Sequence, residues 1–243
     1  MLLGCLSLYA ADNALITKQI TLKLEKAGTL PDRIESSKKY KITNLKIIGE
    51  INGTDLRMIR EMAGINSTGN YTDGKLSVLD LSEAKIVGGG DCYLNNGYDY
   101  TSNDVIGSRA FLGCSGLTSL TLPADITSIG DEAFQGCSGL TSIYVYAEKV
   151  PKIDSNAFKG VDAKKCTVYV PMGTRDDYCA SDFGDYFENI VEFEATGIDK
   201  TTTSTDVEEV VRYSVNGQRL SAPTKGLNIV KYSDGSVKKV AVR

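Results

Sequence analysis

The side chains that could support chemistry in this chain are carboxylates, cysteines and tyrosines, because the 243-residue sequence contains no histidine. Histidine is the commonest general base, the usual partner of serine and cysteine nucleophiles and a frequent zinc ligand. Nothing in the sequence places two of its 31 acidic residues together as a glycosidase requires. The sequence therefore favours a protein that is not an enzyme and predicts no cofactor and no metal ion. An active site would have to lie on irregular segments such as 88–104 or 172–190.

Two of the six cysteines, Cys114 and Cys137, occupy equivalent places in two nearly identical stretches, "GCSGLTSLTLP" and "GCSGLTSIYVY". Stacked one above the other, they could form a disulfide or a redox pair, or they could be small buried side chains in a tight corner. The second interpretation is favoured, because a third copy has Val161 at this position. Three further cysteines show no metal-ligand spacing, although a secreted protein could pair some of them: Cys92, Cys166 and Cys179.

A glycine cluster at 88–90 precedes the polar stretch "DCYLNNGYDYTSND". No Gly-Lys-Ser/Thr follows it, as a phosphate-binding loop would need, and no calcium-loop register fits. We expect a mobile surface insertion. Three tyrosines in it, Tyr93, Tyr98 and Tyr100, are candidates for contact with a partner, as aromatic residues on loops often are.

The elements that position these residues belong to an internal repeat. "IGSRAFLGCSGLTSLTLPADITS" begins at Ile106, and related copies begin at Ile129 and Ile153, so the period is 23 and then 24 residues. Each copy carries an Ala-Phe pair. We expect the three phenylalanines to stack as an aromatic spine on the side opposite the strands: Phe111, Phe134 and Phe158.

The strand motif of the repeat, L-x-x-L-x-L, occurs more widely than the full copies. It begins at Ile42, Leu76, Leu117 and Leu140, and Val168-x-Val170 closes the series. Because alternate strand residues share a face and one rung cannot bury that face alone, about five rungs between residues 42 and 170 should stack into a parallel sheet. The period and the motif are typical of leucine-rich repeats. The expected fold is a solenoid of the α/β class with parallel rungs and irregular or short helical returns.

The sequence resembles the BspA-type leucine-rich repeats of bacterial surface proteins. The resemblance rests on I-G-x-x-A-F-x-G-C-x-G-L-T-S-L-T-L-P at Ile106–Pro123 and its second copy. Residues 44–64 and 76–86 are similar to the usual N-terminal part of that family, and residues 167–194 to its closing stretch. Most of residues 20–195 is covered, and the resemblance implies adhesion as the function.

The outward positions of the predicted strands are the main candidates for ligand binding, because a solenoid presents them on one extended face. We expect the tyrosines to lie beside one another on successive rungs, where aromatic rings and hydroxyls suit contact with proteins or glycans. The alternative is that these are ordinary strand-favouring residues on a solvated sheet. The candidates are Asp80, Ser119, Thr121, Ser142, Tyr144, Tyr146 and Tyr169, together with Ser77.

Both ends of the chain differ from the repeats. Residues 1–14 resemble the end of a secretory signal, and "LLGC" makes Cys5 a candidate for lipidation. A threonine-rich linker (196–209) leads to a small β module (210–243) with hairpin signals at Asn216-Gly217 and Asp234-Gly235. This module is basic and resembles the C-terminal domains of secreted Bacteroidetes proteins, some of which are sorting signals. It could serve sorting or anchoring, or it could be a solubilising end cap.

We therefore expect a leucine-rich repeat domain at 15–195, clearest at 106–171, in a secreted or outer-surface protein that binds host or bacterial surface proteins. The alternative is a glycan-binding accessory module, and an enzyme is the third choice. Peripheral or lipid-anchored membrane association is compatible with the two ends of the chain. The net charge of -4 argues against a nucleic-acid partner.

Overall fold

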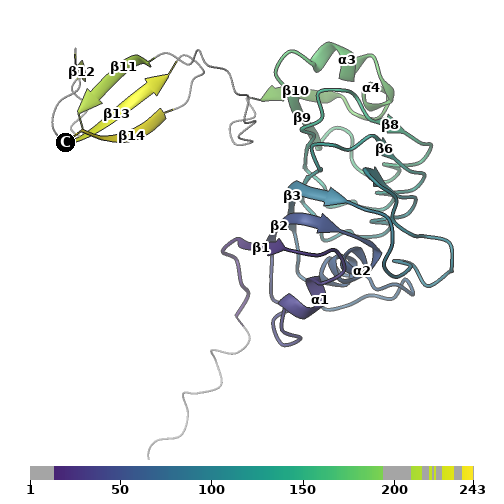
Figure 1. The fold of residues 1–243 in the computed structure, drawn as a ribbon. Helices are drawn as coiled ribbons and strands as arrows, with labels where there is room; N and C mark the ends of the chain where they lie inside the picture. The colour runs from purple at the N-terminus through teal and green to yellow at the C-terminus, as the bar shows by residue number, and fades with distance from the viewer. Residues whose placement is uncertain are drawn as a thin grey trace, which may run out of the picture. The chain divides into compact units, whose positions relative to one another are not determined.

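The computed structural model describes residues 14–193, 209–214, 219–220, 222, 226–232 and 237–242. It divides into two compact units, Met1–Gly197 and Ile198–Arg243, each of which is described by itself (Figure 1). Cys5 and the expected signal remnant up to residue 13 lie outside the described residues. So do the expected linker up to residue 208 and both hairpin turns of the C-terminal region.

A seven-stranded parallel sheet forms one side of the first unit, and its strands follow one another in chain order. Partners in register include Leu45, Leu79, Leu120, Ile143 and Val168, so the five predicted rungs are confirmed with their alignment. Two flanking rungs at the ends of the sheet were not predicted. The strands are β1 (Ile20–Leu24), β2 (Asn44–Ile51), β3 (Val78–Ile86), β5 (Ser119–Thr121), β7 (Ser142–Tyr144), β9 (Thr167–Pro171) and β10 (Asn189–Phe193).

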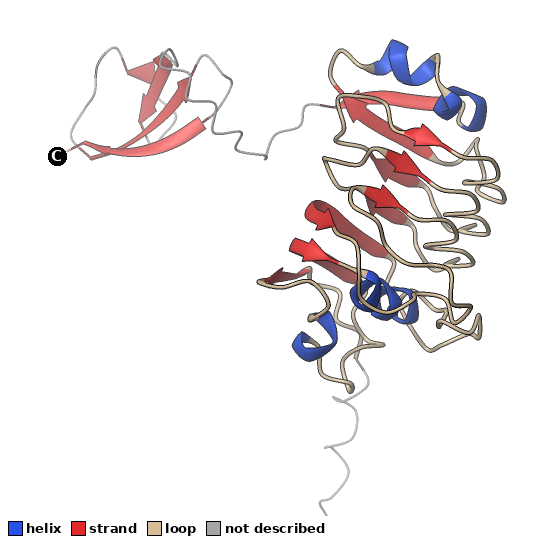
Figure 2. Cartoon of the chain, turned by 45° about the vertical axis from the view of Figure 1, so that its right-hand side comes forward, coloured by secondary structure: helices blue, strands red, loops and turns tan. Residues whose placement is uncertain are grey.

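The returns between repeats are mostly turns, with three short strands in a second parallel sheet: β4 (Val105–Ile106), β6 (Ser128–Ile129) and β8 (Lys152–Ile153). Helices lie at the two ends of the stack of strands (Figure 2). They are α1 (Leu30–Arg33) and α2 (Gly53–Met62) at the N-terminal end, and α3 (Arg175–Cys179) and α4 (Asp182–Tyr186) at the C-terminal end.

The second unit holds a four-stranded antiparallel sheet in the order β12-β11-β13-β14. Its role as a sorting signal or an end cap stays a prediction. The strands are β11 (Glu209–Ser214), β12 (Arg219–Leu220), β13 (Gly226–Tyr232) and β14 (Val237–Val242).

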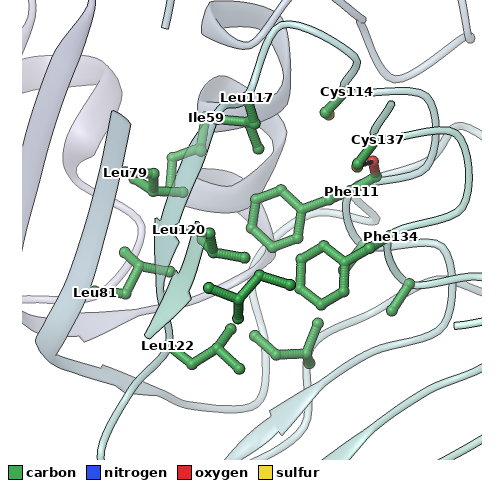
Figure 3. Close-up of a cluster of buried hydrophobic side chains, with 14 of the residues drawn as sticks. Ile59, Leu79, Leu81, Phe111, Cys114, Leu117, Leu120, Leu122, Phe134 and Cys137 are labelled. Atoms are coloured by element: carbon green, nitrogen blue, oxygen red, sulfur yellow. Dashed lines mark hydrogen bonds between the residues drawn. The ribbon is translucent and has the colours of Figure 1, made fainter. Parts of the chain in front are cut away.

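Stacked phenylalanines fill the core opposite the sheet, as predicted. The ring centroids of Phe111 and Phe134 are 5.2 Å apart with planes at 8°, and Phe134 and Phe158 repeat this arrangement at 5.2 Å and 10°. The rings of Phe111 and Phe134 lie side by side, and that of Phe111 points from the returns towards the strand residue Leu120 (Figure 3). Because the period of the sequence equals one turn of the solenoid, each Ala-Phe pair lies directly on the preceding one.

A side-chain hydroxyl just before each of the strands β3, β5 and β7 donates to a backbone carbonyl of the preceding rung. Thr141 donates its hydroxyl to the carbonyl of Thr118 (3.1 Å), Thr118 donates to Ser77 (3.1 Å), and Ser77 donates to Thr43 (3.2 Å). The backbone N–H groups of the same three donors bond to the same carbonyls. The threonine of the repeated "GLTS" therefore adds a side-chain bond to the backbone ladder between rungs.

The return turns form their own ladder, in which backbone N–H groups of one repeat bond to carbonyls of the next. Phe111 N–H donates to Ala133, and Gly113 N–H donates to Gln135. The equivalent carbonyls of the first repeat, at Ala110 and Leu112, have no earlier repeat to supply a donor. Unpaired, such buried carbonyls would cost about 1–3 kcal/mol each.

Arg60 of α2 supplies the missing donors. Its guanidinium is buried and bonds to the carbonyls of Ala110 (2.9 Å) and Leu112 (3.4 Å), and also to that of Arg109 (3.0 Å). The Tyr93 hydroxyl donates to the carbonyl of Ser108 (2.8 Å), which is equivalent to the Asp131 carbonyl of the next repeat. Two side chains thus complete a ladder that the repeats leave open.

Phe134→Ala should lower the free energy of unfolding by about 3–5 kcal/mol, because it removes the central ring of the three-ring stack and leaves a cavity. Chemical denaturation followed by circular dichroism measures this loss. A denaturation midpoint within error of the wild type would contradict the assigned stack.

Arg60→Met should lower the free energy of unfolding by about 2–3 kcal/mol, because it keeps the length of the side chain but leaves buried carbonyls without donors. Arg57→Met on the same helix is the matched control, since Arg57 donates to none of these carbonyls. Denaturation of both variants checks the assignment, and equal losses for the two would show that Arg60 does not serve as a cap.

Candidate functional site

The outer face of the sheet, turned away from the core, carries two rows of side chains that cross the strands in register. The first row runs from β2 to β10 through Lys46, Asp80, Thr121, Tyr144, Tyr169 and Val191. The second runs through Asn44, Val78, Ser119, Ser142, Thr167 and Asn189. The structure thus brings six predicted residues together on one face. Tyr146 follows Tyr144 by two residues, just after the end of β7.

The C-terminal half of this face holds four aromatic side chains, here called the tyrosine cluster: Tyr144, Tyr146, Tyr169 and Phe193. The rings of Tyr144 and Tyr169 are stacked at 4.5 Å with planes at 9°. Phe193 meets Tyr144 edge-on at 5.7 Å and Tyr146 at 5.0 Å. Phe193 was missed by the sequence analysis, although the alternation of Asn189, Val191 and Phe193 could have revealed it.

The stacking decides which parts of the rings a ligand can reach. The 4.5 Å centroid separation is close to the strand spacing of about 4.8 Å, so the rings stand upright on neighbouring strands with their faces together. Partial burial raises the pKa of the Tyr144 and Tyr146 phenols, which therefore stay neutral hydrogen-bond donors at physiological pH. The cluster offers hydroxyls and ring edges more than flat ring faces.

The N-terminal half of the face is charged. The Lys46 ammonium lies 2.7 Å from Glu83 and 3.4 Å from Asp80. The hydrogen bond to Glu83 is the main cause that raises the pKa of Lys46, so this lysine stays protonated. The outer face therefore passes from an ion-pair cluster on β2 and β3 to an aromatic surface on β7, β9 and β10.

The loop 88–104 is only partly as predicted. Tyr98 and Tyr100 are 85% and 50% exposed, but Tyr93 is 1% exposed, and the prediction that it could contact a partner is wrong. Tyr93 is buried because its hydroxyl completes the return ladder. The loop is also held by an ion pair of 3.1 Å between Asp99 and Arg109. A further exposed tyrosine, Tyr71, was not singled out from the sequence.

Cys114 and Cys137 are fully buried free thiols, which agrees with the favoured interpretation of small core residues. Burial raises the pKa of Cys114 to about 12 and also raises that of Cys137. The remaining cysteines of the described ranges are likewise free: Cys92, Cys166 and Cys179. No group of histidine, cysteine or acidic residues suited to hold a metal ion occurs among the described residues.

No helix within the described residues is long and apolar enough to cross a bilayer.

Comparison with protein families finds that residues 100–213 match the BspA type leucine-rich repeat region in 6 copies. None of the curated proteins matches the chain. The family match supports the resemblance drawn from the repeats. Leucine-rich repeat domains generally mediate protein–protein interactions, and BspA-like proteins are typically secreted or associated with the surface.

Cys114, Cys137 and Cys166 should resist alkylation in the folded protein, because burial withholds them from reagent and raises the pKa of each thiol. The exposed Cys179 is the internal control and should react first. Iodoacetamide labelling at pH 8, read residue by residue by mass spectrometry, measures this order. If Cys137 were labelled as fast as Cys179, the burial of Cys137 would be contradicted.

Proposed function

We propose that this chain is a secreted or cell-surface binding protein that engages other proteins through the outer face of its sheet. Adhesion to host or bacterial surface proteins is the biological role that the family resemblance suggests. Membrane association through Cys5 or the basic C-terminal region belongs to the same proposal. The centre of binding is the tyrosine cluster.

The observation that carries the proposal is the arrangement of aromatic rings on the outer face of the sheet. Tyrosines are prominent at the energetic centres of protein interfaces, because they combine apolar area with a hydroxyl at low entropic cost. Tyr144, Tyr146 and Tyr169 are each partly exposed and held by ring contacts. A partner would therefore meet side chains that are already ordered, which reduces the entropic cost of binding.

Glycan binding is the alternative, and the ring geometry favours it less. Sugar rings pack on open aromatic faces, whereas Tyr144 and Tyr169 turn one face of each ring to the other. Catalysis is supported less still, since the described residues include neither a metal-binding group nor a histidine.

The double variant Tyr144→Ala/Tyr146→Ala should bind at least about tenfold more weakly to any matrix protein that the wild type binds. Surface plasmon resonance against a panel of matrix proteins and soluble glycans is the measurement. Tyr71→Ala/Tyr98→Ala is the matched control, because it removes two exposed tyrosines from loops away from the sheet. Thermal melting of both variants confirms folding.

Loss of binding in the first variant alone would support the outer face as the binding site. Loss in the loop variant alone would move the site to the loops. Binding to glycans and to none of the proteins would replace the proposal by the alternative.

A further inference from the structure

The seven-stranded sheet of the first unit has two open edges, β1 at its N-terminal end and β10 at its C-terminal end (Figure 1). Among the described residues no further strand lies beside either of them. An open edge presents unpaired backbone N–H and C=O groups to any strand that approaches it. The two edges are therefore candidate surfaces for association.

The hydrogen bonds of this sheet have one direction. Outward-facing residues bond to the preceding rung, since the N–H of Ser142 donates to the carbonyl of Thr118. The carbonyl of the outward-facing Tyr144 accepts from the N–H of Leu122, again on the preceding rung. Because successive residues of a strand point their backbone groups to opposite sides, inward-facing residues bond to the following rung. Each strand thus has one side for a preceding strand and one side for a following strand.

The two open edges are complementary in this direction. The free side of β1 presents the backbone groups of Thr21, which faces outward beside Lys46. The free side of β10 presents those of Ile190, which is buried and faces inward beside Val168. The Nε of Arg175 donates to the Ile190 carbonyl at 3.1 Å, which agrees with a carbonyl directed away from β9. Strand β10 therefore offers what a following strand needs, and β1 offers what a preceding strand needs.

The register of the sheet fixes how the two edges would meet. Ile20 on β1 and Ile190 on β10 hold the same place in the rung, because in-register pairs connect them through all the strands between. Lys18 and Glu188 each precede that isoleucine by two residues, and both are exposed. A β1 strand set beside β10 in this register therefore brings a lysine of one copy next to a glutamate of another.

The charges of the two ends are opposite. Residues 14–43, which include β1 and α1, carry seven lysines and arginines against three acidic residues. Residues 172–193, which include α3, α4 and β10, carry six acidic residues against one arginine. Opposite charges attract the N-terminal end of one copy to the C-terminal end of another, whereas two like ends repel. Lysines near an edge strand therefore discourage pairing of β1 with a second β1 and favour pairing with β10.

We propose that copies of this chain associate end to end, with β1 of one copy added as a parallel strand to β10 of the next. Each copy uses two different surfaces, so the contact is heterologous. Because each new rung is displaced along the stack, the product is an open chain of copies rather than a closed dimer. The inference goes beyond the proposed function: a chain presents several outer faces together, which raises the avidity for a partner with several sites.

Sedimentation velocity of the full chain alone measures the association. At about 50 mM salt the weight-average mass should rise with protein concentration and pass that of a dimer. At about 500 mM salt it should fall towards that of a monomer, because salt screens the attraction between the ends. A mass that stays that of a monomer, or that stops at a dimer, would overturn the proposal. No matrix protein is present, so such a failure leaves the proposed function standing.

Charge reversal tests which ends meet. Lys18→Glu and Glu188→Lys should each weaken association about tenfold, because each turns an attractive pair into a repulsive one. An equimolar mixture of the two variants should restore the growth in mass, since the two reversed charges then face each other across the contact. Lys149→Glu, which changes an exposed lysine outside both ends, is the matched control and should associate like the wild type. A mixture no larger than either variant alone would contradict the assigned contact.

Backbone substitution tests the strand edge itself. Thr21→Pro should abolish association while keeping the fold, because it removes an N–H group of the free side and places a ring there. Thr21→Val keeps that N–H group and should associate like the wild type. Arg175→Met should strengthen association about threefold, since it frees the Ile190 carbonyl. Thermal melting checks the fold of each variant, and a folded Thr21→Pro variant that still forms chains would overturn the proposal.

Discussion

The structure depends on how backbone hydrogen bonds are satisfied between successive repeats. A parallel solenoid joins each repeat to the next, but it leaves a buried row of carbonyls at its first return. Arg60 and Tyr93, which precede the clear repeats in the chain, fill that row with side-chain donors. Burial lowers the pKa of the Arg60 guanidinium. The cost of this burial is offset because three carbonyls accept hydrogen bonds from it. The phenylalanine stack and the sheet can then start from a completed edge.

Periodicity explains how much could be predicted from the sequence. The stack of Phe111, Phe134 and Phe158 follows from a period of 23 and then 24 residues, because one period is one turn. The rungs and their alignment follow from the recurring L-x-x-L-x-L motif, whose spacing is wider at the N-terminal end. The buried cysteines follow from the same comparison of copies. Each of these predictions needed only that equivalent residues meet equivalent surroundings.

The ends of the solenoid could not be predicted in this way, since their residues occur once. Helix α2 was not expected, although Asn52 and Asp55 form a reciprocal capping box at its start. Tyr93 was assigned to an exposed loop because nothing local distinguishes it from Tyr98. Its burial depends on a carbonyl of Ser108 that only the three-dimensional stack leaves open. For the same reason the sequence placed Tyr144 and Tyr169 together but missed Phe193 on the unpredicted strand β10.

The separation of caps from repeats has a consequence for the evolution of length. Arg60 and Tyr93 finish one end, and the segment with α3 and α4 covers the other, where Phe183 and Phe187 pack near the ring of Phe158. A whole 23-residue unit duplicated between them would meet the same neighbours on both sides and disturb neither end. Each such duplication would widen the outer face by one strand spacing, about 4.8 Å, and add two new surface positions. The solenoid can therefore act as a ruler, in which the span available to a partner grows in fixed steps at little cost to stability.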